Sequence, residues 1–98
     1  MKKYLALDSM TAEKCVKIWG AETQMDKLIE ECAELIHAAI RCKGRGLLEK
    51  EHFAEEIADV IIMIQQIEHM DCELELKISK YQVQKIKRLK ELIKEEEI

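Results

Sequence analysis

Proline is absent from this 98-residue chain, and glycine occurs only three times. Tight turns depend heavily on these two residues, so a sandwich or barrel of many short strands is disfavoured. The length is that of one domain, with little room for a second. Apolar residues make up 48% of the chain and charged residues 37%. This composition is typical of soluble amphipathic helices and not of disordered chains.

Long hydrophobic runs are also missing. The longest apolar run covers residues 60–64, whereas a membrane-spanning helix needs roughly 20 apolar residues. The basic start, Met1 to Lys3, is followed by too short an apolar stretch for a secretory signal. We therefore expect no membrane association and a cytoplasmic location.

Cysteine spacing and net charge disfavour two further classes of protein. No CxxC pair and no zinc-finger pairing with histidine occurs among Cys15, Cys32, Cys42 and Cys72. These residues are expected to be reduced, buried thiols and not a disulfide framework. The 16 basic and 20 acidic residues give a net charge of −4. A nucleic-acid binder gains affinity by neutralising phosphates, so we expect no nucleic-acid partner.

Apolar residues at steps of three and four predict four helices, at residues 9–19, about 21–43, about 48–70 and about 73–96. Ser9 or Thr11 is the expected N-cap of the first helix, and Gly20 its end. The glycine-containing segment 43–46 is expected to form the loop after the second helix. The fourth helix is rich in lysine and begins after a break near residues 71–72.

The predicted faces of these helices define the fold. The apolar stripe of the second helix centres near Cys32 and contains Met25, Leu28, Ile29, Cys32, Leu35, Ile36, Ala39 and Ile40. Its second face carries Gln24, Lys27, Glu31, Glu34 and Ala38. Residues 57–64 of the third helix are apolar nearly all round, which predicts burial on most sides. We expect a single all-α domain over residues 1–98, a four-helix-type bundle whose thin core favours self-association.

One acidic pattern, E-E-x-x-[ED], occurs on both the second and the third helix, as Glu30, Glu31 and Glu34 and as Glu55, Glu56 and Asp59. At 100° per residue, Glu31 and Glu34 lie about 60° apart on one side of their helix, and Glu56 and Asp59 repeat this geometry. The apolar neighbours of Asp59 predict that it is buried and needs a cation or strong hydrogen-bond donors. If the two faces meet, the four carboxylates form an all-oxygen site suited to Mg²⁺ or Mn²⁺. The simpler alternative is a pair of solvated surface faces.

With Trp19, Gly20, Gln24 and Leu28, these acidic motifs resemble the MazG-like all-α nucleoside triphosphate pyrophosphohydrolases over about residues 15–90. That family carries ExxE and ExxD on successive helices separated by a glycine-containing loop. The resemblance implies Mg²⁺-dependent cleavage of a (d)NTP between the α and β phosphates, which yields a nucleoside monophosphate and pyrophosphate. It also implies a homodimer or homotetramer.

The resemblance assigns roles to individual residues. It implies that the metal is held by Glu31, Glu34, Glu56 and Asp59. Glu30 or Glu31 would act as the general base. Lys80 matches the lysine of the family's Lys-x-x-x-Asn motif, with Gln84 in place of the asparagine. Trp19 would stack on the nucleobase and Gln24 would contact its edge.

Two other readings of the sequence remain open. Glu34 with His37 and Glu49 with His52 both have ExxH spacing, which is the ligand spacing of di-iron carboxylate bundles. Alternatively, the chain is a helical interaction module with no enzymatic activity. A plain interface explains the composition, but it does not explain the doubled acidic motif.

Overall fold

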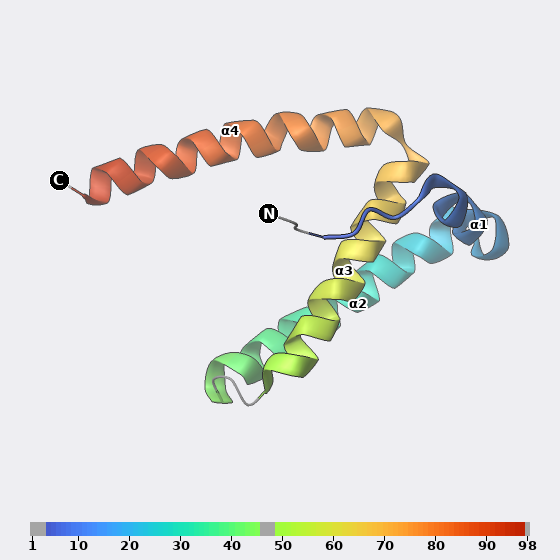
Figure 1. The fold of residues 1–98 in the computed structure, drawn as a ribbon, viewed down its shortest axis with the longest axis horizontal. Coiled ribbons are helices and arrows are strands. Elements are labelled where there is room, and N and C mark those ends of the chain that lie inside the picture. The colour runs from blue at the N-terminus through green and yellow to red at the C-terminus, as the bar shows by residue number, and fades with distance from the viewer. Residues whose placement is uncertain (1–3, 46–48, 98) are drawn as a thin grey trace.

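The computed structural model describes residues 4–45 and 49–97 of the chain. Four helices form, α1 (Ser9–Trp19), α2 (Ala21–Arg45), α3 (Lys50–Met70) and α4 (Cys72–Glu96), and the described residues contain no strand. The long helices α2 and α3 pack against each other, and α1 contacts both of them (Figure 1). The all-α prediction is confirmed. None of the described helices is long and apolar enough to cross a membrane.

The boundaries of α1 have local causes. Its N-cap is Asp8, whose Oδ2 accepts hydrogen bonds from the backbone N of Thr11 at 2.9 Å and from the Thr11 hydroxyl at 3.0 Å. The expected cap at Ser9 or Thr11 is therefore wrong, because the carboxylate of Asp8 accepts from the first helical turn. Gly20 ends the helix as predicted. It has a φ of 89°, a conformation that glycine adopts without steric cost.

The ends of α2 and α4 refine the predicted boundaries. Helix α2 continues through Gly44 to Arg45, so the chain leaves the helix later than the expected loop at 43–46. Gly46 lies outside the described residues. Asp71 caps α4, and its Oδ1 accepts from the backbone N of Glu73 at 3.0 Å and of Leu74 at 3.3 Å. The predicted break near residues 71–72 is confirmed.

The face of α2 that packs inward is the polar one. Its buried residues are Gln24, Glu31 and Ala38, and the small side chain of Ala38 leaves room for α3 to approach. Half of the apolar stripe is exposed, namely Met25, Ile29, Ile36 and Ile40, and the other half is only half-buried. The prediction of two distinct faces on α2 is thus confirmed, but α3 covers the second face and leaves much of the apolar stripe bare.

Helix α3 is buried on one side only. Its buried residues are Glu56, Val60, Met63, Gln66 and Ile67. The predicted burial on most sides is wrong for the protomer, because Ile62 and Ile64 are 43% and 42% exposed. These two side chains lie on the part of α3 that neither α1 nor α2 covers.

Helix α4 stands apart from the other helices. It contacts α3 but neither α1 nor α2, and none of its residues is buried. Figure 1 shows it leading away from the α2–α3 pair. The radius of gyration of the chain is consequently 16.4 Å, whereas about 12.6 Å is expected for a compact domain of this length. The chain thus forms a packed three-helix unit, and the fourth helix of the all-α fold projects from it.

Candidate metal centre

Carboxylates from α2 and α3 gather where the two helices face each other. Two groups of three have ligand oxygens that all lie within 4.8 Å of one another. One group contains Glu30, Glu31 and Glu34, and the other contains Glu31, Glu56 and Asp59. We call these five residues the acidic centre. Glu31 belongs to both groups, so it links the motif on α2 to the motif on α3.

Two members of the acidic centre are buried, Glu31 at 6% exposure and Glu56 at 8%. One oxygen of each is partnered: Glu31 Oε1 lies 3.4 Å from Lys27 Nζ, and Glu56 Oε1 lies 3.9 Å from His52 Nε2. The Oε2 atom of each is buried and has no hydrogen-bond partner. A carboxylate oxygen left in this state is costly, so both positions favour a proton or a cation.

The buried carboxylate on α3 is not the one that the sequence predicted. Asp59 is exposed, and Glu56 is buried instead. The three residue steps from Glu56 to Asp59 rotate the helix by about 300°, which turns Asp59 toward the edge of the α2–α3 contact. Asp59 remains within 4.8 Å of Glu31 and Glu56 through its carboxylate oxygen. A cation at this point would therefore be reachable from solvent on the Asp59 side.

The pKa values of Glu31 and Glu56 are shifted by burial and by the charged groups around them. Burial raises the pKa of the Glu31 carboxyl above its usual value, the hydrogen bond from Lys27 opposes the shift, and the charges of Glu34 and Asp59 add to it. Burial likewise raises the pKa of Glu56, and neighbouring carboxylates add to the shift while His52 opposes it. Both groups lose their charge more readily than exposed glutamates do.

A pH dependence of stability follows from these shifts. Both pKa values are higher in the folded protein than their ordinary value of 4.5. At pH values between this ordinary value and the folded pKa, the folded state therefore binds more protons than the unfolded state does. The contribution of these groups to the free energy of unfolding is complete below about pH 4.5 and is lost as the pH rises through the folded pKa values. Urea unfolding in EDTA at a series of pH values should show this loss.

The control is the double variant Glu31→Gln with Glu56→Gln, in which this contribution is absent. Other groups act in the opposite direction, since hydrogen bonds from Thr11 lower the pKa of Asp8. Subtracting the two pH profiles removes such common contributions. Superimposable profiles would contradict the assignment of both raised pKa values.

A hollow of about 390 Å³ lies beside the acidic centre, and we call it the side pocket. It is lined by Trp19, Thr23, Gln24, Asp26, Lys27, Glu30, Met63 and Gln66. Glu30 belongs to the acidic centre as well, and Lys27 pairs with Glu30 and Glu31 at 3.5 and 3.4 Å. The pocket and the acidic centre are thus adjoining parts of one surface. The structure brings Trp19 and Gln24 to it.

Gln66 is a residue that the sequence analysis missed. It is 7% exposed, and its Oε1 is the third buried side-chain atom without a hydrogen-bond partner among the described residues. A single glutamine on an apolar helix carries no motif. The available signal was its spacing, because it lies seven residues after Asp59 and three after Met63, on the same side of α3.

Lys80 and Gln84 are not brought to the acidic centre of their own chain. Both are exposed on α4, which makes no contact with α2. The Lys80 Nζ lies 5.4 Å from the centroid of the Tyr81 ring. An apolar groove on the same helix is lined by residues between Leu74 and Leu89, and neither Lys80 nor Gln84 lines it. Within one chain, Lys80 and Gln84 therefore do not belong to the same site as the carboxylates.

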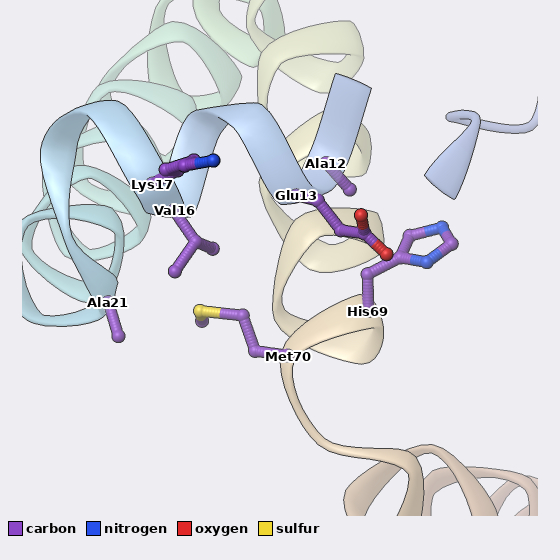
Figure 2. A pocket seen from close by; sticks show the side chains of 7 residues that line it. All are labelled: Ala12, Glu13, Val16, Lys17, Ala21, His69 and Met70. Atoms are coloured by element: carbon purple, nitrogen blue, oxygen red, sulfur yellow. The ribbon is translucent and has the colours of Figure 1, made fainter. Parts of the chain in front are cut away.

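A second hollow, of about 330 Å³, lies at the junction of α1, the start of α2 and the end of α3 (Figure 2). In Figure 2 the Glu13 carboxylate and the His69 ring point toward each other beside a patch formed by Val16, Ala21 and Met70. The His69 Nε2 also lies 3.0 Å from the carbonyl oxygen of Leu7. None of the residues predicted to form the site lines this hollow.

The two ExxH pairs do not join a cluster of metal ligands within residues 4–45 and 49–97, where the groups of three or more contain carboxylates alone. Glu49 pairs with Arg41 at 3.4 Å and with Arg45 at 3.3 Å. His52 is on the first turn of α3, and its nearest acidic partner is Glu56. The described geometry thus gives the di-iron alternative no support.

No family model, curated protein or solved structure matches the chain. The resemblance to the MazG-like family therefore stays a prediction.

Proposed function

We propose that the protein is a Mg²⁺-dependent pyrophosphohydrolase that cleaves a (d)NTP between its α and β phosphates. The observation that carries the proposal is the pair of buried, unpartnered carboxylate oxygens on Glu31 and Glu56, two residues that each have a carboxylate oxygen within 4.8 Å of one of Asp59. A surface cluster would leave such oxygens in water. Buried and unsatisfied oxygens at one point have the properties of ligands for a cation.

The donor set favours a hard divalent cation. All ligands are carboxylate oxygens, and no histidine or cysteine joins either group of the described residues. Oxygen ligands suit Mg²⁺ and also Mn²⁺, which is the alternative ion. We assign Glu31, Glu56 and Asp59 as ligands. Glu34 joins them through its contact with Glu31, and the open side at Asp59 leaves room for phosphate oxygens.

We assign the other roles in the reaction to the metal ion, Glu30 and Lys27. When bound, Mg²⁺ neutralises charge on the phosphate oxygens and polarises the phosphoanhydride. Glu30 is exposed and is not needed to fill the buried centre, so we assign it as the base that accepts a proton from the attacking water. As water adds to the α phosphorus, the bond between the α and β phosphates breaks and pyrophosphate leaves. Lys27 is placed beside Glu30 to attract the triphosphate.

The side pocket supplies a place for the nucleobase. Trp19 lies on its rim, where an exposed indole face is suited to stacking, and Gln24 lies buried in its wall. A pocket of about 390 Å³ accommodates a small ligand such as a single nucleotide. The substrate class is accordingly a free nucleoside triphosphate and not a nucleic acid.

The test is a pyrophosphate-release assay over the four NTPs, the four dNTPs and dUTP, with and without Mg²⁺. We expect metal-dependent release of pyrophosphate with a monophosphate as the second product. Release of single phosphates would replace the proposed reaction by another phosphohydrolase chemistry. Silence on every nucleotide with both Mg²⁺ and Mn²⁺ would contradict the proposal and favour the interaction module, which the exposed apolar faces of α2 and α4 also suit.

We further propose that the protein is a homo-oligomer. The chain exposes 8227 Å², whereas about 5,800 Å² is expected for a compact monomer of 11.5 kDa. The excess of about 2,400 Å² is larger than the roughly 800 Å² per partner that a standard interface buries. Part of this exposed area is apolar, since Ile36 of α2, Ile62 of α3 and Leu89 of α4 are among the exposed side chains, and we assign a second copy of the chain as the partner that covers them. A homodimer and a homotetramer both satisfy this area.

A further inference from the structure

We infer that Gln66 is the residue that selects the nucleobase, by accepting a hydrogen bond from an N–H group on the edge of a base held in the side pocket. The inference rests on the proposed function for the identity of the ligand as a nucleotide. The inference specifies one further property of this nucleotide: its base must donate a hydrogen bond from an N–H group.

The side pocket is lined by residues of three helices, some of them apolar and some polar. Trp19 ends α1, Gln24 is on the first turn of α2, and Met63 and Gln66 are on the second half of α3. Trp19 is 57% exposed and Met63 is buried. An aromatic ring and a thioether offer two polarizable surfaces for a flat heteroaromatic ring. Their position in one pocket fits a planar ligand with polar atoms on its edge.

The edge-reading group is Gln66 because its oxygen is unsatisfied. The side chain is more than nine-tenths buried and lines the pocket, yet its Oε1 has no hydrogen-bond partner. Buried polar atoms in folded proteins almost always have a partner. A ligand that donates an N–H to this atom removes the cost, whereas a ligand without such a donor leaves it in place.

The chemistry of the amide defines the ligand edge. A glutamine side chain presents an acceptor and a donor side by side. Its complement is a ring edge with an N–H donor next to an acceptor nitrogen or oxygen, as on the Watson–Crick edges of the bases. Gln24 is also buried in the pocket wall, but its amide has no comparable buried, unpartnered atom among the described residues.

The position of the pocket makes this contact a filter for the reaction. Lys27 and Glu30 line the pocket, and Lys27 also pairs with Glu31 of the acidic centre. A base seated against Gln66 thus directs its phosphates past Lys27 toward the carboxylates. A nucleotide whose base does not satisfy Gln66 loses part of the binding energy that places its phosphates there.

The experiment uses Trp19, the only tryptophan of the chain, as the reporter. Nucleoside monophosphates are titrated in EDTA, so that neither metal nor turnover is involved, and binding is checked by equilibrium dialysis. Two bases are compared with analogues that lack the exocyclic amine donor: adenine with purine, and cytosine with pyrimidin-2-one. For the base that binds best, we expect the analogue to bind about tenfold more weakly.

The variant Gln66→Leu should remove this preference, so that base and analogue bind equally. It should also raise the unfolding midpoint of the ligand-free protein, because a buried unsatisfied amide is replaced by an apolar side chain. The matched control is Gln82→Leu, which removes an exposed amide on α4. It should keep the preference for the base over its analogue.

In the binding experiment, the inference is overturned by a preference that persists in Gln66→Leu, or by no binding of any monophosphate by either method. Failure of the proposed function gives a different pattern. If no nucleotide is hydrolysed but the Gln66-dependent preference is found, the pocket assignment stands and the hydrolase assignment fails. If hydrolysis is found with equal kcat/KM for base and analogue, the hydrolase stands and the role of Gln66 is refuted.

Discussion

Replacing Glu31 by glutamine is expected to abolish metal-dependent turnover and, in the same protein, to increase metal-free stability at neutral pH. Glu31 is the one carboxylate shared by both ligand groups, and its Oε2 is buried without a partner. The amide keeps the shape of the side chain but cannot offer the metal a charged oxygen. Charge stabilisation by a metal is worth several kcal/mol, and about 4 kcal/mol corresponds to about 10³-fold in rate.

The gain in stability has the opposite cause. Without metal, the buried charge of Glu31 is opposed by burial and by the charges of Glu34 and Asp59, which together raise its pKa. Glutamine has no charge to bury, so the free energy of unfolding in EDTA should rise. The measurements are kcat/KM with Mg²⁺ and urea unfolding in EDTA, both at pH 7.5.

Glu55→Gln is the matched control for Glu31→Gln. Glu55 is an exposed carboxylate of the same acidic pattern on α3, but it belongs to neither ligand group. It should retain turnover within a few-fold. Wild-type kcat/KM in Glu31→Gln, or equal losses in the two variants, would refute the assignment of the metal centre.

Self-association is expected to fail when charge is placed on the bare stripe of α2. Ile36 and Ile40 are 63% and 62% exposed and lie one turn apart, on the side of α2 that α3 does not cover. Lysine at both positions places two charges in an interface that depends on apolar burial. Sedimentation equilibrium should give a multiple of the 11.5 kDa chain mass for the wild type and the chain mass for the double variant.

The control for the stripe is Thr23→Lys, an exposed position on α2 that lies about 140° around the helix from Ile36 and about 100° from Ile40. It should assemble as the wild type does. A wild-type protein that sediments as a monomer at every concentration would refute the proposed oligomer. Such a protein would have to tolerate all of its exposed apolar faces in water.

The helices were predictable because their signals are local. Gly20 and Asp71 interrupt the apolar pattern at single positions, and the observed helix ends lie within three residues of the expected ones. What packs against each face is not a local property. The pattern of α2 correctly separates two faces, but it does not tell that α3 covers Glu31 and Ala38 while Ile36 faces outward.

The acidic centre was predictable in its membership but not in its burial. Two copies of one carboxylate spacing on consecutive helices were enough to expect a common site, and the structure brings Glu31, Glu56 and Asp59 within 4.8 Å. Which carboxylate is buried depends on the rotation of α3 about its own axis, and one residue changes this by 100°. Gln66 could not be singled out, because an unsatisfied amide is defined only by its neighbours in space.

Helix α4 gives the chain an unusual folding equilibrium. It contains 25 residues, a length of about 37 Å, and it buries none of them within the protomer. Single helices in water are only marginally stable, and they gain most of their stability from a packed apolar face. In the proposed homo-oligomer, the helical state of α4 would therefore depend on the concentration of the protein. On dilution of that oligomer, the amide hydrogens of α4 should exchange with solvent long before those of α2 and α3, and the cooperative folding unit would be the assembly and not the single chain.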